Sequence, residues 1–212
     1  MPRIPSLSPA LFLAAAANAA APVGLFNGRD FSGWEFVANS AVNLADVCKM
    51  TPDGSITAAG KPVGFLATTT SYKNYTLHAE WRWPGPPGNG GVLVHIASGP
   101  KDRQWPVCFQ IQLKHKSVGD LLPIAGATFA EPLTSPPNAA VPLHAHEAPD
   151  SEQPAGKWNS CDIVCQDGTI EVSINGVKQN RVTGCSVPQG RVGFQFEGTP
   201  FDLRNVRLAT LD

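Results

Sequence analysis

Alternation of apolar and polar side chains is the feature that most constrains the fold of this chain. From Tyr75 to Trp83 every second residue is apolar and the residues between them are polar, and the same pattern recurs over residues 106–115 and 192–197. Successive side chains of a β-strand point to opposite faces, so each of these segments is predicted to be a strand with one buried face. The pattern therefore predicts an all-β protein.

Turn signals separate the predicted strands. Asp167-Gly168 and Asn175-Gly176 each lie between strand-like runs within residues 158–182. These dipeptides are typical of two-residue hairpin turns, so the segment is predicted to be a three-stranded meander. Near the C-terminus the alternation changes phase close to Arg204, which predicts a β-bulge there.

Length and composition favour one domain. The chain has 212 residues, with 20 glycines and 20 prolines, and contains no internal repeat or linker. This balance suits many short strands in a β-sandwich of two antiparallel sheets. Residues 1–21 carry Arg3, an apolar stretch and then Ala17-Asn18-Ala19, which predicts a signal peptide followed by one domain over 22–212. The protein is thus expected to be exported, periplasmic or extracellular; a disordered Ala/Pro tail is the alternative.

Charge and motifs exclude several function classes. Lys plus Arg number 16 against 17 Asp plus Glu, without a basic run interleaved with aromatic residues, so nucleic acid is not an expected partner. No later segment is long and apolar enough to span a membrane. The sequence lacks HExxH, CxxC, P-loop, GxGxxG and GxSxG motifs, which excludes the common zinc protease, nucleotide-binding and serine hydrolase classes.

The cysteines do not indicate a disulfide framework. Five is an odd number, and Cys161 and Cys165 are four positions apart on one predicted strand. At about 3.3 Å per residue they lie about 13 Å from each other, too far for a bond. Both are expected to be buried thiols.

Polar side chains on several predicted strands are candidates for a binding surface. If these strands are neighbours in one sheet, their polar faces form a concave surface that can bind sugar hydroxyls; a solvated outer sheet face is the alternative. Trp34 and Trp105 could stack on sugar rings. The polar residues are His78, Glu80, Arg82, His95, Gln110, Gln112, Lys114, Gln195 and Glu197.

A Pro-rich stretch over residues 116–157 is expected to be a long loop, which in a compact domain is usually functional or disordered. It contains His144 and His146, alternate histidines that could chelate a metal ion from one face of an extended segment. Solvated loop histidines are the alternative.

Eight segments carry a family resemblance in the expected order. They are Leu25–Trp34, Glu80–Pro84, Gly88–His95, Phe109–Lys114, Gly119-Asp120, Gly156–Asn159, Ile174–Val177 and Phe201–Leu208. Together they resemble the 3-keto-disaccharide hydrolase family over about residues 24 to 210. The resemblance implies a concanavalin-like jelly-roll β-sandwich, usually exported, in bacteria that oxidise a glycoside at C3 before cleaving it. Relatives often have a carboxylate where this chain has Gln110.

The resemblance implies cleavage of 3-keto-glycosides by elimination and hydration. A ketone at C3 acidifies the hydrogen on C2, so a base can remove it, the enolate can expel the C1 group, and water then adds to the enone. No organic cofactor is expected, although a divalent cation could polarise the ketone. The candidates are Glu197, Glu80 or His95 as base, Arg82 and Lys114 as stabilisers of the enolate oxygen, and Gln110, Gln112, Asp120, Gln195 and His78 as ligands of a small carbohydrate substrate.

Three alternatives stay open. Glu80 and Arg82 could simply pair with each other on one strand face. A non-catalytic carbohydrate-binding module could use the same surface, because this fold hosts both kinds of protein. A conventional two-carboxylate glycoside hydrolase is disfavoured, because no strand carries alternate acidic residues.

Overall fold

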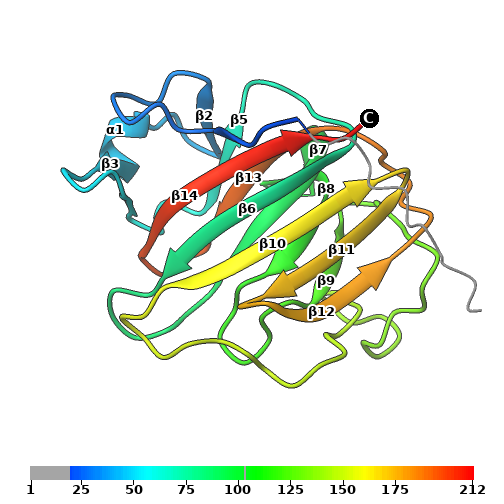
Figure 1. Ribbon diagram of the computed structural model, residues 1–212. Coiled ribbons are helices and arrows are strands. Elements are labelled where there is room, and N and C mark those ends of the chain that lie inside the picture. The colour runs from blue at the N-terminus through cyan, green and yellow to red at the C-terminus, as the bar shows by residue number, and fades with distance from the viewer. Residues whose placement is uncertain (1–19, 103) are drawn as a thin grey trace, which may run out of the picture.

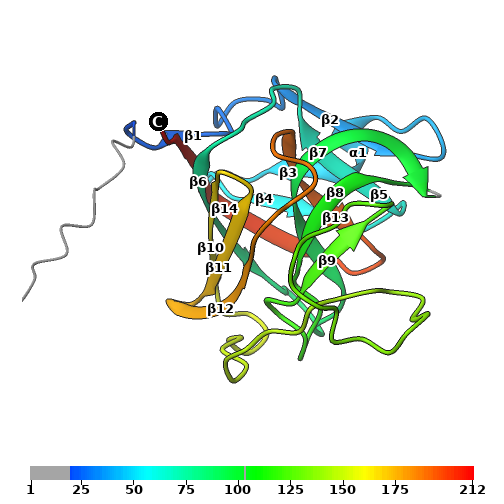
Figure 2. The same cartoon turned by 90° about the vertical axis from the view of Figure 1, so that its right-hand side faces the viewer.

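The computed structural model describes residues 20–102 and 104–212, which form two antiparallel β-sheets packed face to face (Figures 1 and 2). The expected all-β architecture is confirmed. Nearly all of the predicted signal peptide lies outside the described residues, so it stays a prediction. Among the described residues, no helix is long and apolar enough to cross a membrane.

The first sheet has eight strands in the order β12-β11-β10-β6-β14-β4-β3, with β1 also paired to β14. Its strands are β1 (Val23–Gly24), β3 (Cys48–Met50), β4 (Ile56–Ala58), β6 (Tyr75–Arg82), β10 (Asn159–Gln166), β11 (Thr169–Ile174), β12 (Val177–Val182) and β14 (Phe201–Thr210).

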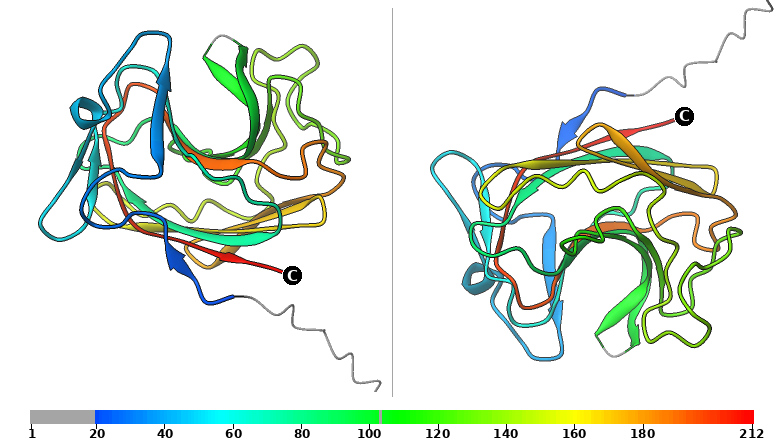
Figure 3. Two further views of the ribbon diagram at one scale, coloured as in Figure 1. Left: turned by 90° about the horizontal axis from the view of Figure 1, so that it is seen from above. Right: turned by 90° about the horizontal axis from the view of Figure 1, so that it is seen from below.

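The second sheet has six strands in the order β2-β5-β13-β7-β8-β9. Figure 3 shows it end-on as a trough whose concave side faces away from the first sheet. The strands are β2 (Trp34–Ala38), β5 (Gly64–Thr68), β7 (Gly90–Asp102), β8 (Trp105–Gln112), β9 (Leu121–Ile124) and β13 (Arg191–Phe196); the short helix α1 spans Leu44–Val47.

The main core lies between the sheets and follows the alternation in the sequence. The apolar residues of β6, including Trp81 at 1% exposure, are buried, and those of β13, including Phe194, pack against them from the second sheet. The polar residues of β6 alternate with them and are half-buried. Burial of this apolar surface is the main driving force for folding, which is why the strongest alternation marks the central strands.

Local turn and bulge predictions are confirmed. β10, β11 and β12 form the expected antiparallel meander, with Asp167 and Asn175 both at positive φ in its turns. The register of β14 against β6 shifts between Arg204 and Arg207, with Asn205 at φ 52°, so the expected bulge is present. All five cysteines are buried and unpaired, as expected for Cys161 and Cys165.

The prediction that His95 leaves the core is wrong. His95 is 1% exposed, and its Nδ1 donates to the carbonyl of Val187 at 2.8 Å. A bulge shifts the register of β7 against β8 between Val94 and Ser98, and His95 has φ 53°. The extra residue changes the phase of the strand. The imidazole therefore turns into the main core, and Ile96 turns to the concave side instead.

A glycine on the concave side allows β13 to pack closely between its neighbours. A Cβ at Gly193 would lie 2.2 Å from the carbonyl oxygen of Leu66 and 3.2 Å from Cα of Ala67. We expect Gly193→Ala to lower the free energy of unfolding by about 1–3 kcal/mol, because overpacking displaces a neighbouring strand. Urea denaturation measures this change. Gly85→Ala is the matched control, since a Cβ there meets open space; equal midpoints for the two variants would contradict the prediction.

Candidate functional site

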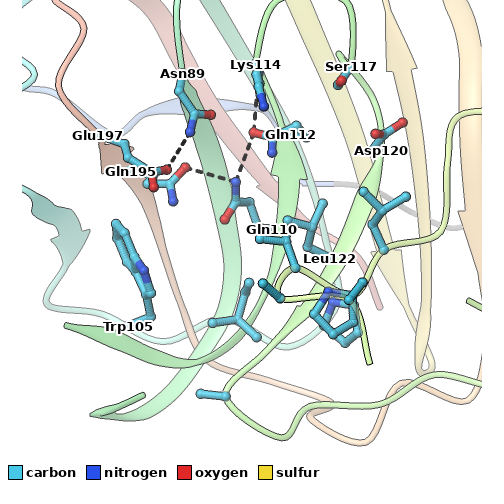
Figure 4. Close-up of a pocket in the computed structure, with 18 of the residues that line it drawn as sticks. Asn89, Trp105, Gln110, Gln112, Lys114, Ser117, Asp120, Leu122, Gln195 and Glu197 are labelled. Carbon is cyan, nitrogen blue, oxygen red and sulfur yellow. Dashed lines mark hydrogen bonds between the residues drawn. The ribbon is translucent and has the colours of Figure 1, made fainter. Parts of the chain in front are cut away.

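A cavity of about 630 Å³ opens on the concave side of the six-stranded sheet (Figure 4). Its polar floor is built by Gln195 on β13 and by Gln110 and Gln112 on β8, with β7 between them. Gly91 pairs with both Gln195 and Gln112 across the sheet. A Cβ at Gly91 would lie 2.8 Å from Cγ of Gln110, so this glycine leaves the space that the amide occupies.

The three floor amides form one hydrogen-bonded chain. Nε2 of Gln110 donates to Oε1 of Gln195 at 2.9 Å and to Oε1 of Gln112 at 3.1 Å. All three residues are less than 7% exposed, so the chain fixes the direction of each amide. Within the described chain, Oε1 of Gln110 and Nε2 of Gln112 and Gln195 form no side-chain hydrogen bond. The floor can therefore both donate to and accept from sugar hydroxyls.

Glu197 is a half-buried carboxylate at the edge of this floor. Asn89 donates from Nδ2 to its Oε2 at 2.8 Å. Burial raises the pKa of Glu197 above its ordinary value, and the positive charge of Lys114 partly offsets this rise. A carboxylate with a raised pKa is a stronger base than an exposed one, so Glu197 has the character that proton abstraction needs.

Lys114 is exposed and follows β8 at the rim of the cavity. Among the described residues no carboxylate lies within 4 Å of its ammonium group, so its charge is available to a ligand. The cavity thus combines a basic carboxylate, a lysine ammonium group and a fixed set of amides.

Asp120 joins the cavity from the loop between β8 and β9 and is 5% exposed. Its Oδ1 accepts from the backbone N–H of His146 at 2.9 Å and from Nδ1 of His146 at 2.6 Å. The segment 125–158, which connects β9 to β10, is tied down here and by Asn180 on β12, whose Nδ2 donates to the carbonyl of His144 at 3.1 Å. This segment therefore forms a fixed wall.

The two alternate histidines have different partners. Nδ1 of His144 donates to the carbonyl of Pro132, whereas that of His146 donates to Asp120. In the part of the chain that the structure describes, no three His, Cys, Asp or Glu side chains come together to hold a metal ion. Both histidines thus have a structural role in the long loop.

The other part of the cavity wall is apolar, and Figure 4 shows two of its side chains, Leu122 next to Gln110 and Trp105 farther from the amides. Trp105 lines it, whereas Trp34 is 6% exposed, stacks on Phe26 at 4.2 Å and donates from Nε1 to the carbonyl of Leu25. Only Trp105 of these two tryptophans is placed to touch a sugar. The remaining apolar lining is Leu122, Pro123, Ile124, Ala125, Gly126 and residues 139–143.

The structure separates His78, Glu80 and Arg82 from the cavity. All three lie on β6 of the eight-stranded sheet. The expectation that they share one polar face with Gln110, Gln112 and Gln195 is therefore wrong. Alternation shows which side chains avoid the core, but it cannot show which of two sheets a strand joins. Together with the burial of His95, this leaves Glu197 as the one predicted base that lines the cavity.

On β6 these residues form cross-strand ion pairs. Glu80 accepts from Nε of Arg204 at 2.6 Å, Arg82 donates to Asp202 at 2.7 Å, and His78 contacts Asp162 at 2.6 Å. The indole of Trp158 contacts both guanidinium groups, at 4.6 Å from Arg82 and 4.1 Å from Arg204. Glu80 and Arg82 thus pair with other residues rather than with each other.

Alignment with a protein-family model covers residues 21–209 and gives the 3-keto-alpha-glucoside-1,2-lyase-like domain family. The chain belongs to this family. The match spans both sheets and every strand that lines the cavity. It confirms the resemblance to 3-keto-disaccharide hydrolases and places this lyase-like domain among carbohydrate-active proteins.

Solved structures support the fold of the lyase-like domain. A protein from Parabacteroides distasonis, provisionally described as a glycosyl hydrolase, is 25% identical, with a TM-score of 0.66 over 90% of this chain and 94% of that one. A second such protein from that organism is 18% identical, with a TM-score of 0.65 over 91% and 100%. The carbohydrate binding module CBM66 from Bacillus subtilis is 12% identical, with a TM-score of 0.58 over 82% and 93%. The concanavalin-like jelly-roll fold is confirmed. No curated protein sequence matches the chain.

Sequence reasoning missed several cavity residues of the lyase-like domain. Asn89 follows a Pro/Gly-rich loop and Ser117 lies in a segment without alternation, so no strand pattern could place them. The sequence pattern likewise gave no sign that the apolar segment 139–143 lines the cavity. A clue was present in Asn89, because it directly precedes the glycines that open β7.

Proposed function

We propose that this protein cleaves 3-keto-glycosides by eliminating the C1 group and hydrating the product. The observation that carries the proposal is a carboxylate of raised pKa, Glu197, beside a floor of fixed amides, with the ammonium group of Lys114 at the rim and no carboxylate of the described residues within 4 Å of it. Family membership supports the same chemistry, and so does the likeness to proteins provisionally described as glycosyl hydrolases.

The proposed first step breaks the C2–H bond. Glu197 takes the proton, and the electron pair left on C2 delocalises onto the oxygen at C3, where the charge of Lys114 stabilises it. The enolate then re-forms the ketone and a C1–C2 double bond, and the bond from C1 to the leaving-group oxygen breaks. A positioned base contributes about 10²–10⁴-fold to such a step, and one preorganised donor about 10²–10³-fold.

The second step adds the elements of water to the enone. A water molecule adds its oxygen to C1 of the enone and gives up one proton, which neutralises the alkoxide or phenolate expelled in the first step, and C2 receives the proton that Glu197 has carried since then. The net reaction is hydrolysis with no change of oxidation state. The steps above do not require a divalent cation, although one could polarise the ketone as a Lewis acid.

The amides and Asp120 hold the keto-sugar in this proposal. Asp120 is fixed by His146, and its second carboxylate oxygen has no hydrogen-bond partner among the described residues, so it can accept from a sugar hydroxyl. Gln110, Gln112 and Gln195 supply donors and acceptors in fixed directions. Such positioning lowers the entropy cost of bringing the C2 hydrogen to the base.

The test compares a 3-keto-glucoside with its unoxidised parent. Purified protein is incubated with each, and release of the aglycone is followed by chromatography, with NMR to distinguish the enone from the hydrated sugar. We expect release from the keto-sugar only. Binding without release would favour a carbohydrate-binding module, and cleavage of the unoxidised parent would favour a conventional glycosidase; either outcome contradicts the proposal.

We also propose that the protein is exported, on the strength of the signal-peptide pattern in residues 1–21. Expression of the full chain in a Gram-negative host followed by fractionation and intact-mass measurement tests this. A mature protein beginning near Ala20 in the periplasm is expected. A chain retained in the cytoplasm with its first residues intact would contradict export.

A further inference from the structure

The lining of the cavity is divided into a polar half and an apolar half along β8. Gln110 and Gln112 lie toward one end of this strand, and Trp105 begins the other. Gln110 lies five positions after Trp105, which corresponds to about 16 Å of extended chain. Figure 4 shows the amides, Asn89 and Glu197 together, with Trp105 apart from them. The cavity therefore has room for two chemically different groups.

Trp105 in the apolar half is supported by a hydrophobic cluster. Trp105 and Ile124 pack against a second hydrophobic cluster on the concave side of the sheet, which consists of Phe65, Ala67, Leu93, Ile96 and Cys108. Trp105 is only half-buried and also lines the cavity, so part of its surface is open to a ligand. A supported indole of this kind is a rigid stacking surface.

The rest of the lining of this half is apolar as well. Residues 139–143 read Ala-Ala-Val-Pro-Leu and line the cavity, and Val141 is 52% exposed. Among the described lining residues from 122 to 126 and from 139 to 143, no side chain carries a hydrogen-bonding or titratable group. A second sugar would lose water from its hydroxyls here without gaining side-chain partners.

We propose that the apolar half is a leaving-group subsite for aromatic aglycones, so that the preferred substrates are 3-keto-glycosides of aromatic alcohols rather than 3-keto-disaccharides. This inference rests on the proposed function, because the polar half must hold the keto-sugar. An aromatic ring stacks on Trp105 and buries its faces without unsatisfied polar atoms. A phenol, with a pKa of about 10 like that of tyrosine, also leaves as its anion without a proton donor, and this half offers none.

The test uses two substrates whose leaving groups are both alkoxides. These are benzyl 3-keto-glucoside and a 3-keto-disaccharide of glucose. A sugar hydroxyl is at least as acidic as benzyl alcohol, so a preference for the benzyl substrate reports recognition rather than leaving-group ability. We expect kcat/KM to be at least tenfold higher for the benzyl substrate.

Variants separate the two halves. Trp105→Ala is expected to lower kcat/KM for the benzyl substrate about tenfold and to change that for the disaccharide less than threefold. Trp158→Ala, on the outer face of the other sheet, is the matched control and leaves the ratio unchanged. Val141→Asn adds a polar group at an exposed position, so it folds even if Trp105→Ala does not, and it is expected to shift preference toward the disaccharide.

The outcomes are distinct. The aromatic subsite is overturned if the wild-type protein turns over both substrates and is at least as efficient with the disaccharide. It is also overturned if the Trp105 and Val141 variants affect both substrates equally. Either result leaves the proposed function standing. Turnover of neither substrate by the wild-type protein overturns the proposed function, and the subsite falls with it.

Discussion

Replacing Glu197 by glutamine is expected to lower kcat for aglycone release from a 3-keto-glycoside by about 10²–10⁴-fold. The amide cannot take the proton from C2, although its oxygen can still accept the hydrogen bond from Asn89. The measurement is single-substrate kinetics alongside thermal unfolding, which should be unchanged or slightly improved because a half-buried charge is removed. Loss of turnover in a folded variant separates chemistry from stability.

The control for this change is Glu171→Gln. Glu171 lies on β11 of the other sheet, where its exposed carboxylate accepts from Lys178 at 2.6 Å. Removal of this charge should leave kcat within about twofold, since a surface ion pair contributes about 1 kcal/mol or less to stability. A Glu197 variant that turns over as fast as the Glu171 variant would show that another group is the base.

The pH profile offers a second check on Glu197. Burial raises its pKa, and only the ionised carboxylate can act as base, so activity should rise as pH increases through that raised pKa. The acidic limb should therefore lie above the ordinary range for glutamate, and it should disappear in Glu197→Gln. A limb at the position of an exposed carboxylate would contradict this.

Lys114→Met is expected to lower kcat/KM by about 10²–10³-fold, because the enolate oxygen loses its positive partner. A second effect follows from the geometry. Lys114 lowers the pKa of Glu197, so its removal should move the acidic limb of the pH profile to higher pH. Steady-state kinetics over a pH series measures both effects in one experiment.

Two variants make this result specific. Lys114→Arg keeps the charge and should keep the position of the acidic limb, even if the rate falls through poorer fit. Lys178→Met removes an exposed lysine that is paired with Glu171 and should change neither quantity. A limb that stays in place after Lys114→Met would show that the two groups do not interact.

The sequence predicted strands well because burial follows side-chain alternation. Gln110, Gln112 and Gln195 were placed on the outward side of their strands and do lie together. Glu80 shows the same alternation, but β6 belongs to the other sheet, and strand pairing depends on contacts distant in the chain. Physical reasoning on one segment at a time cannot supply that information.

His95 and His146 show two further limits. One extra residue in β7 reverses the phase at His95, and a bulge leaves little trace in a run of apolar residues. His146 reaches Asp120 from a segment without regular structure, so only the tertiary fold brings them together. Sheet membership, one β-bulge and the irregular loop were thus the three obstacles to predicting the site.

The segment 125–158 belongs to neither sheet, yet it supplies most of the apolar wall. It takes no part in the strand ladders and is held instead by hydrogen bonds to the strands and loops around it, such as those to Asp120 and from Asn180. Its length and side chains can consequently diverge between relatives while the strands beneath keep their chemistry. Substitutions in this segment can therefore change substrate specificity during evolution without altering the proposed catalytic residues at the strand ends.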